Sequence, residues 1–540
     1  MRRVPWTSVF LRVLLLISLL SSTQSASTRS RGKKKIAKET KEINVCEIED
    51  QDTPIYCYCN NNAVRNATEA KCLVLRSFNS NDPTWDYFGS QIYLEELTFN
   101  VKMLNGLETL EYIPTQLLRR LKNLRKITFH YAKIDQLPEY AFSNLSTIAY
   151  IDLNKNSISS LRMHAFENMT NLTVVALNEN RITEINRDTF VDLPSLKRLL
   201  LSHNNISTLH DKAFKHLITL EELELSDNRI QVITGDSFHS LRNLLRLDLR
   251  NNLIDMIGDR TFIEMPSLRD LELDSNKIVY ISEKALQGLK NLRKLSLSDN
   301  KLITLEPDFL AGAPGVYFLD LRDNQLKTIT FDNVKPIVSN MYNSTSHLFL
   351  NGNNLICDCK LAWIWALRNE TKNRKLRDAL EKLTCFLESN NASRKINNAD
   401  HEWNEALEIA RHSPKEYLTE NIRTGKFDTD NAYLGDEYES EDGYEDTNSD
   451  SQPKVQVIEG KSMQVRNLFE LKMEELPCPE PSREDLMASE QPSSRHENAP
   501  VGSSGSIWFS STAKSIHLDL PVFAYTFVLL LARPMLFIFT

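Results

Sequence analysis

The sequence predicts an α/β repeat solenoid, a curved stack of similar turns with a parallel β-sheet on its concave face and disulfide-bonded caps at both ends. Three observations favour this fold. One pattern of spaced apolar residues recurs at a constant step through the middle of the 540-residue chain. An asparagine ends almost every copy, and two groups of cysteines flank the copies. The segments outside this stack need separate explanations.

The repeated pattern places apolar residues at fixed intervals before an asparagine, as in Leu172, Val175, Leu177 and Asn180. Its opening positions are 124, 148, 172, 196, 220, 244, 268, 292 and 316, a constant step of 24 residues. A weaker copy opens at Leu94, and a last copy follows after a 29-residue step. These eleven copies, spanning 94–354, identify a leucine-rich repeat.

The side chains of each copy divide between the core and the surface. Apolar residues that alternate along a short strand point to one side of it, and stacked strands then form one parallel sheet over a shared core. The asparagine can bond backbone groups where the chain leaves the strand and form a ladder with its neighbours. A column of phenylalanines at the same step predicts a buried spine rather than a ligand site: Phe142, Phe166, Phe190, Phe214, Phe238 and Phe262.

Eight cysteines lie where the end turns of the stack would expose core, in caps predicted over 46–93 and 355–480. Their even number indicates disulfides formed in an oxidising compartment, and the C-x-C spacing without a histidine pair argues against zinc. The caps resemble those of extracellular leucine-rich repeat proteins. That resemblance implies four pairs: Cys46 with Cys59, Cys57 with Cys72, Cys357 with Cys385, and Cys359 with Cys478.

The chain begins with the pattern of a secretory signal peptide over residues 1–26. Arg2 and Arg3 precede an apolar run from Val13 to Leu20, which is much shorter than the roughly 20 residues that a membrane span requires. Residues 27–45 are basic and form either a plain solvated tail or a contact for anionic glycans at the cell surface.

The other end has the layout of a signal for a glycosylphosphatidylinositol (GPI) anchor. Small residues at 510–513 and a polar spacer precede an apolar tail that contains Arg533 and Pro534. We expect removal of residues 512–540, a lipid on Ser510 or Ser511, and a flexible stalk over 481–511. The protein would then sit on the outer leaflet of the plasma membrane; the alternative is a span with almost no cytoplasmic tail.

Sequons and one acidic stretch also lie between the two processing signals. We expect glycosylation at Asn66, Asn144, Asn168, Asn171, Asn205, Asn343, Asn369 and Asn391, with sugar on a flank or the back of the stack. An acidic insertion at about 413–465 is predicted to be disordered. Its residues Tyr438 and Tyr444 are candidates for sulfation, but we favour a solvated loop.

The outward strand positions form a broad surface free of core packing, and acidic and basic rows alternate along it. This pattern suits a protein partner, and one such partner is a second copy whose Arg246 and Arg250 meet Asp270, Glu272 and Asp274 in an antiparallel two-fold contact. The alternative is that the charges only keep the sheet soluble. The predicted binding residues are Arg198, Glu222, Glu224, Arg246, Asp248, Arg250, Asp270, Glu272, Asp274, Lys294, Phe318, Asp320 and Arg322.

Other function classes find little support in the sequence. A formal charge of -8, from 64 basic and 72 acidic residues, gives no reason to expect a nucleic-acid partner. We find no catalytic motif, metal-ligand spacing or cofactor motif, so we expect a protein that binds rather than an enzyme.

Three further segments and the anchor-type tail carry a closer resemblance: Ile55–Cys59, Asp82–Asp86 and Leu367–Asn373. Together they are similar to insect cell-adhesion proteins with leucine-rich repeats. The resemblance implies a GPI-anchored protein that mediates homophilic adhesion between cells, in neuromuscular or axon target recognition. Two alternatives stay open: a heterophilic receptor or co-receptor subunit that signals through a transmembrane partner, and a matrix-associated structural protein.

Overall fold

A computed structural model describes residues 43–48, 53–101, 110–388, 455–458 and 461–478. The chain divides into two compact units, 1–479 and 480–540, and all described residues belong to the first. Several predicted features lie outside the described residues: the signal peptide, the basic segment, the stalk, Tyr438, Tyr444, Asn391, Ser510 and Ser511. None of the described helices is long and apolar enough to cross a membrane.

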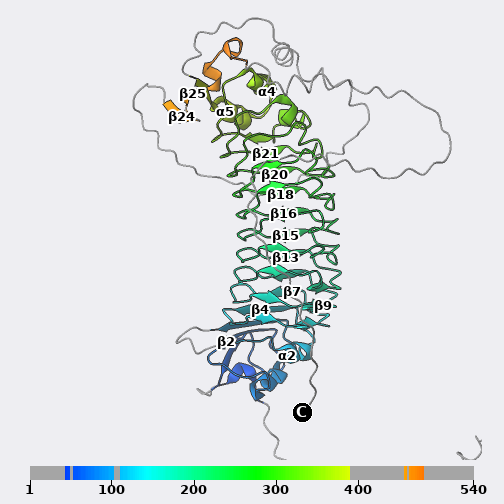
Figure 1. Ribbon diagram of the computed structural model, residues 1–540. Coiled ribbons are helices and arrows are strands. Elements are labelled where there is room, and N and C mark those ends of the chain that lie inside the picture. Colours follow the sequence, from blue (N-terminus) through cyan, green and yellow to red (C-terminus); the bar gives the residue numbers. More distant parts are fainter. Residues whose placement is uncertain (1–42, 49–52, 102–109, 389–454, 459–460, 479–540) are drawn as a thin grey trace, which may run out of the picture. The chain divides into compact units, whose positions relative to one another are not determined.

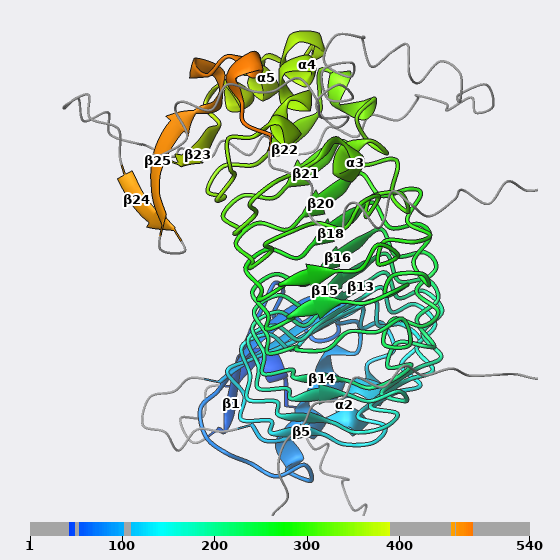
Figure 2. The same ribbon diagram turned by 45° about the horizontal axis from the view of Figure 1, so that its top comes forward.

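Each of the eleven repeats contributes one strand to a single parallel sheet, which confirms the predicted solenoid (Figure 1). From β4 to β21, neighbouring strands pair residues 24 apart, as Val174 with Arg198. The first pair joins Glu96 to Lys126 and the last joins Phe318 to His347 across the 29-residue step. The strands are β3 (Glu96–Val101), β4 (Lys126–His130), β7 (Tyr150–Asp152), β10 (Val174–Ala176), β13 (Arg198–Leu200), β15 (Glu222–Glu224), β16 (Arg246–Asp248), β18 (Asp270–Glu272), β20 (Lys294–Ser296), β21 (Phe318–Asp320) and β22 (His347–Phe349). Figure 2 shows β13 to β22 as neighbouring strands.

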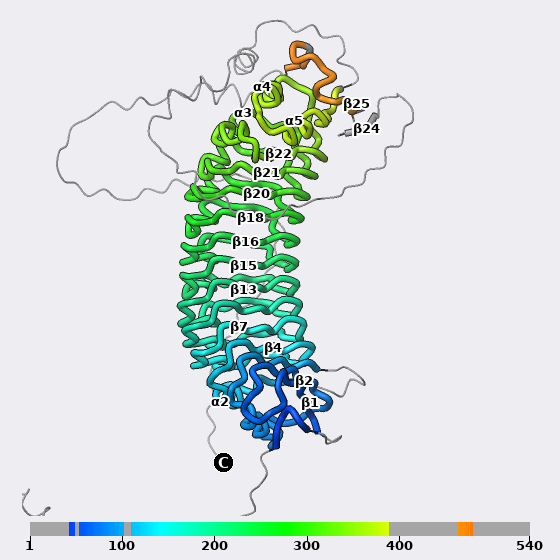
Figure 3. Tube along the Cα trace, turned by 180° about the vertical axis from the view of Figure 1, so that it is seen from behind, coloured from blue at the N-terminus to red at the C-terminus, as the bar shows by residue number. Residues whose placement is uncertain are grey.

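The chain returns between these strands mainly through turns and short strands, so that successive turns of the trace stack on one another (Figure 3). Two short helices interrupt this pattern, α2 (Thr115–Arg120) and α3 (Phe331–Val334). The return strands form four small parallel sheets. They are β5 (Gln136–Leu137) with β8 (Ser160–Leu161), β11 (Glu184–Ile185) with β14 (Thr208–Leu209), β17 (Met256–Ile257) with β19 (Tyr280–Ile281), and β6 (Phe142–Ser143), β9 (Phe166–Glu167) and β12 (Phe190–Val191).

The core runs the length of the stack between the main sheet and the return side. The strand leucines, such as Leu199, Leu223 and Leu247, are fully buried. The six phenylalanines of the predicted spine are buried as well. The rings of Phe142 and Phe166 stack with centroids 5.3 Å apart, so this column is packing and not a ligand site.

The asparagine that follows each strand ties its turn to the preceding one. Asn228 Nδ2 donates to the carbonyls of Leu225 at 3.0 Å and Leu201 at 3.0 Å, and its Oδ1 accepts from the Ile206 N–H at 2.9 Å. The hydrogen bonds thus run to backbone groups rather than from one ladder amide to the next. The same pattern recurs at Asn180, Asn204, Asn252, Asn276, Asn300, Asn324 and Asn353.

The N-terminal cap extends the main sheet. Strand β1 (Ile55–Cys59) pairs antiparallel with β2 (Glu69–Val74), and β2 pairs parallel with β3. The 3-10 helices η1 (Val45–Glu47) and η2 (Pro83–Gln91) complete the cap. Disulfides join Cys46 to Cys59 and Cys57 to Cys72, and the second pair links residues that lie directly opposite in the β1–β2 register.

The C-terminal cap combines helices with a separate antiparallel sheet. Its helical segments are η4 (Cys359–Leu361), α4 (Trp363–Glu370), α5 (Arg374–Glu381), η5 (Leu468–Glu470) and η6 (Met473–Glu475), whereas η3 (Asn340–Tyr342) lies between β21 and β22 in the last return. Trp363 Nε1 donates to the carbonyl of Ile329 at 2.9 Å, which fixes α4 to the repeats. Disulfides join Cys357 to Cys385 and Cys359 to Cys478.

The predicted disordered insertion at about 413–465 is wrong at its C-terminal end. Strands β24 (Val455–Ile458) and β25 (Lys461–Asn467) fall inside or across it, and β25 pairs antiparallel with both β24 and β23 (Thr384–Glu388). Figure 2 shows β25 beside β23. The physical reason is the backbone pairing between Cys385 and Arg466, which brings the chain back to the cap before Cys478.

Candidate functional site: the open face of the sheet

The main sheet presents three columns of side chains on its open face, because every second residue of each strand points away from the core. The first column contains Lys126, Tyr150, Val174, Arg198, Glu222, Arg246, Asp270, Lys294, Phe318 and His347. The middle column contains Thr128, Asp152, Ala176, Leu200, Glu224, Asp248, Glu272, Ser296, Asp320 and Phe349. The last column, two residues further on, includes Ser202, Ser226, Arg250, Asp274, Ser298 and Arg322.

The middle column is largely covered by its neighbours. Asp248, Glu272 and Asp320 are only 2%, 5% and 2% exposed. The prediction that these three acids present charge to a partner is therefore wrong, because the long side chains of the two outer columns lie over them. The other predicted binding residues are at least partly exposed: Arg198, Glu222, Glu224, Arg246, Arg250, Asp270, Asp274, Lys294, Phe318 and Arg322.

Much of the predicted charge is already paired within the chain. Glu272 accepts hydrogen bonds from Lys294 Nζ at 3.0 Å and Arg246 Nη2 at 3.4 Å, and Arg250 Nε forms an ion pair with the same carboxylate at 3.0 Å. Arg250 Nη2 also contacts Asp248 Oδ2 at 2.7 Å, and this hydrogen bond raises the pKa of Arg250 above its ordinary value. The buried acids thus hold the surface cations in place.

Two carboxylates on the face have neither an ion pair nor a side-chain hydrogen bond to another described residue. They are Glu224 and Asp270, and both are partly buried. Burial raises the pKa of both carboxyls above the ordinary value. Removing a carboxylate from water without supplying a cation costs free energy, and such groups are enriched at functional sites.

An aromatic cluster lies at the C-terminal end of the face. Phe318, His347 and Phe349 place their ring centroids 5.4 to 5.8 Å apart, Lys294 Nζ lies 5.4 Å from the Phe318 centroid, and the Arg322 guanidinium lies 5.0 Å from that of Phe349. Burial lowers the pKa of His347 and favours its neutral form. The sequence analysis missed His347 and Phe349, although alignment of the last copy on Leu348 and Leu350 places them in these columns.

The described sequon asparagines lie outside the three columns. Asn66, Asn144, Asn168, Asn171, Asn343 and Asn369 are exposed, and Asn205 is partly exposed. Asn168 Nδ2 donates to Asn144 Oδ1 at 2.6 Å, so these two sequons sit on adjacent turns at the ends of β9 and β6. Glycans at these positions would leave the open face of the sheet accessible.

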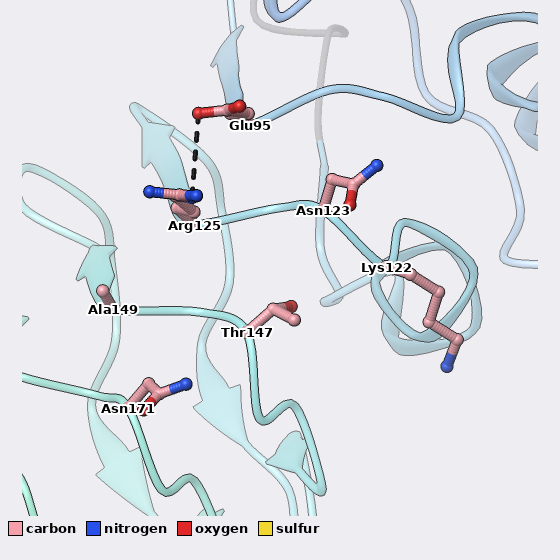
Figure 4. A pocket seen from close by; sticks show the side chains of 7 residues that line it. All are labelled: Glu95, Lys122, Asn123, Arg125, Thr147, Ala149 and Asn171. Atoms are coloured by element: carbon pink, nitrogen blue, oxygen red, sulfur yellow. Dashed lines mark ion pairs between the residues drawn. The ribbon is translucent and has the colours of Figure 1, made fainter.

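A pocket of about 360 Å³ lies beside the sheet, where the chain enters strands β4, β7 and β10 (Figure 4). Its lining includes an ion pair between Glu95 and Arg125, with 3.7 Å between Oε2 and Nε. Asn171 forms part of the wall, so a sugar on this sequon would cover the pocket. No group of acidic, histidine or cysteine side chains among the described residues is arranged to hold a metal ion. The open face is therefore the candidate site.

Comparison with known proteins agrees with this architecture. The family described as "Leucine rich repeat" matches residues 122–174, 146–206, 170–230, 218–278 and 266–326. Residues 122–326 of this chain are therefore leucine-rich repeats. The matched segments cover most of the eleven-stranded stack, whereas the two disulfide-bonded caps lie outside them.

The leucine-rich repeat protein is similar to connectin of Drosophila melanogaster, with 49% identity over 61 residues. That stretch spans 11% of this chain and only 9% of connectin. The protein is thus connectin-like over a short segment.

Solved structures with a similar fold include Toll in the Toll–Spatzle complex of Drosophila, at 23% identity and a TM-score of 0.40, covering 56% of this chain and 44% of that chain. Two others come from a complex of TLR13 with ssRNA13 and from an octameric complex of Latrophilin 3, Unc5D and FLRT2. Their identities are 22% and 24%, with TM-scores of 0.34 and 0.36. The matched regions cover 54% and 46% of this chain, and 51% and 81% of the chains in those two structures. These likenesses concern the fold alone.

Proposed function

We propose that this leucine-rich repeat protein is a cell-surface adhesion protein that binds a second copy of itself on an apposed cell through the open face of the sheet. The main support is the pair of desolvated carboxylates, Glu224 and Asp270, which lack a cation of their own on a face that carries Arg246, Arg250 and Lys294. A partner that brings a cation to such a carboxylate would stabilise its ionised form, and an identical chain carries cations on the same face.

The short similarity to connectin favours an adhesion role, and the resemblance in the caps and tail extends it to homophilic adhesion. By the same resemblance, the tissue setting that we propose is neuromuscular or axon target recognition. Enzyme activity is not part of this proposal, because the open face holds no arrangement of a nucleophile with a general base.

The proposed location is the outer leaflet of the plasma membrane, through a GPI anchor on Ser510 or Ser511. The four disulfides support an oxidising, extracellular environment. Treatment of intact cells with a phosphatidylinositol-specific phospholipase should release the protein into the medium. Retention on the treated cells would contradict the anchor without affecting the proposal about the face.

A cell-mixing assay tests homophily directly. Cells that express the full chain, labelled in one colour, are mixed with unlabelled parental cells in suspension. We expect clusters that contain only expressing cells. Clusters that recruit parental cells would instead support the alternative function, a heterophilic receptor or co-receptor subunit that captures another extracellular protein and signals through a transmembrane partner.

A further inference from the structure

We propose that two copies meet face to face about a two-fold axis that lies between β16 and β18, with their stacks antiparallel. This inference rests on the proposed homophilic function and specifies its contact. A two-fold axis parallel to the strands reverses the stacking direction but keeps each column of side chains opposite itself. Strand β16 of one copy then opposes β18 of the other, β15 opposes β20, and β13 opposes β21.

The central contacts in this arrangement join opposite charges. Arg246 of one copy faces Asp270 of the other in the first column, and Arg250 faces Asp274 in the last column. Asp274 accepts hydrogen bonds from Ser298 N and Oγ at 3.0 and 2.8 Å but has no cation of its own among the described residues. Because the axis is two-fold, each contact occurs twice.

Further from the axis, the matches continue. One strand further from the axis on each side, Glu222 of one copy faces Lys294 of the other. Within a single chain the strands that carry these two residues are about 14 Å apart, at three steps of the usual ~4.8 Å. In the next strands Arg198, which is exposed and pairs with Glu222 of its own chain at 2.6 Å, faces the ring of Phe318, a contact of the cation–π type. The aromatic cluster at the C-terminal end of the face would thus take part in the interface.

The arrangement supplies Asp270 with a cation at ion-pair distance, which the single chain lacks. Asp270 gains the guanidinium of Arg246, whereas Glu224 faces Ser296 and gains no cation of its own. Arg246 is suited to this exchange, since its contacts within the chain are long: 3.4 Å to Glu272 and 3.9 Å to Glu222. Its side chain can turn toward a partner at little cost.

Alternative placements of the two-fold axis, one half-step or one step along the stack, bring like charges together. An axis on β16 sets Arg246 against itself, and an axis on β18 does the same to Asp270. An axis between β18 and β20 opposes Arg250 to Arg322. Each of these contacts is repulsive, and like-charge juxtaposition at an interface costs several kcal/mol.

An axis between β15 and β16 is the closest competitor. It pairs Glu222 with Arg246 and Arg198 with Asp270, but it sets Glu224 against Asp248 and Asp152 against Asp320. The proposed axis brings only one acid pair together, Asp248 with Glu272, and both of these are buried under the arginines of their own chain. The structure therefore favours the axis between β16 and β18.

A charge-swap experiment tests this contact with full-length chains on cells. We expect Arg246→Glu and Asp270→Arg each to weaken self-clustering about ten-fold or more. When two molecules of the same variant meet, the substituted residue of one faces a like charge on the other. A mixture of cells that express the two variants should cluster with each other, because every contact is again between opposite charges. Arg269→Glu, next to Asp270 but outside the three columns, is the matched control and should cluster like the wild type.

The outcomes separate the two proposals. Failure of the wild-type chain to self-cluster overturns the proposed function together with the contact. Normal wild-type clustering without rescue in the mixture overturns the contact alone, as does an equal loss in Arg269→Glu. Rescue of Arg246→Glu by Glu222→Arg, instead of by Asp270→Arg, would move the axis to between β15 and β16. Thermal unfolding of the secreted variants shows whether any loss comes from misfolding.

Discussion

Arg250 Nε lies 3.0 Å from the buried carboxylate of Glu272, an ion pair that joins the turn after β16 to the neighbouring strand β18. The same carboxylate holds Lys294 from the next strand, so one buried acid fixes cations from both sides. This arrangement gives the open face a defined pattern of charge before any partner arrives. Side chains that are already ordered lose less conformational entropy on binding.

Replacement of Glu272 by glutamine should destabilise the protein. The substitution removes the negative charge that Arg246, Arg250 and Lys294 share. Glutamine keeps nearly the same shape and packing as glutamate, so the change in stability reports mainly on this charge. Breaking a buried pair by removing one partner costs about 3–5 kcal/mol, and because these cations are partly exposed we expect about 2 kcal/mol here. Urea unfolding followed by circular dichroism measures this loss.

Glu221→Gln is the control for that experiment. Glu221 also forms an ion pair with a neighbouring strand residue, Lys197, at 2.5 Å, but both side chains are exposed. We expect a change below about 0.5 kcal/mol, as for other solvent-exposed pairs. Equal effects of the two substitutions would mean that Glu272 does not organise the face.

Asp270→Asn should separate stability from binding. Burial raises the pKa of Asp270 in the folded chain, so the stability linked to its protonated form is present at low pH and is lost as the pH rises through that raised pKa. At pH 7 the ionised group therefore destabilises the isolated protein. We expect the asparagine variant to be more stable at pH 7 by up to about 1 kcal/mol, with no difference at pH 3, and to cluster poorly.

The exposed Asp299 provides the comparison, since Asp299→Asn should alter neither property. The measurement is thermal unfolding of the secreted protein at both pH values, together with the clustering assay. A variant of Asp270 that loses stability at pH 7 would show that the carboxylate has a stabilising partner in the single chain.

Self-clustering should weaken on acidification. The proposed contact needs Asp270 in its ionised form, because it faces Arg246 of the other copy, and burial raises the pKa of this carboxyl. Asp270 lies among Lys294, Glu272, Arg246 and Arg269 of its own chain. As the pH falls through the raised pKa, Asp270 takes up a proton and the cell clusters should disperse, at a higher pH than an ordinary carboxyl would require. Light scattering of the cell suspension over pH 4–7.5 measures this, and a flat profile would argue against Asp270 in the contact.

Asn228→Ala should cost about 2–4 kcal/mol of unfolding free energy, because it leaves two buried carbonyls and the Ile206 N–H without their partner. Asn243, whose exposed amide donates once, to the carbonyl of Ile218 at 2.7 Å, offers a matched control with an expected loss below about 1 kcal/mol. Urea unfolding compares the two. Similar losses would mean that the ladder position adds nothing beyond one surface hydrogen bond.

The strands and core were predictable because the 24-residue step alone fixes which side chains point inward. Leu223 and Leu247, or Phe142 and Phe166, recur at that step and are buried together. Burial of Asp248 could not be predicted in this way. Its exposure depends on where the long side chain of Arg250 lies, which is set by distances in three dimensions and not by spacing in the sequence.

The C-terminal cap illustrates a second limit. Strand β25 pairs with β23 across a separation in sequence that no local pattern reveals, and the charged residues before it favoured a prediction of disorder. The disulfide pairs, by contrast, could be proposed only from the resemblance to other caps. Spacing within a cysteine group leaves several pairings open.

The disulfide between Cys359 and Cys478 should stabilise the end of the cap without affecting the repeats. It joins residues 119 apart, whereas each repeat contacts mainly its neighbours, so a change at one end should remain local. In the double variant Cys359→Ser and Cys478→Ser, we expect faster hydrogen exchange over residues 461–478 and unchanged protection of the strands from β4 to β20. The same double substitution at Cys57 and Cys72 should instead loosen β1 and β2 at the other end. Loss of protection throughout the stack in the first variant would show that this cap is required for the whole solenoid and not only for its own end.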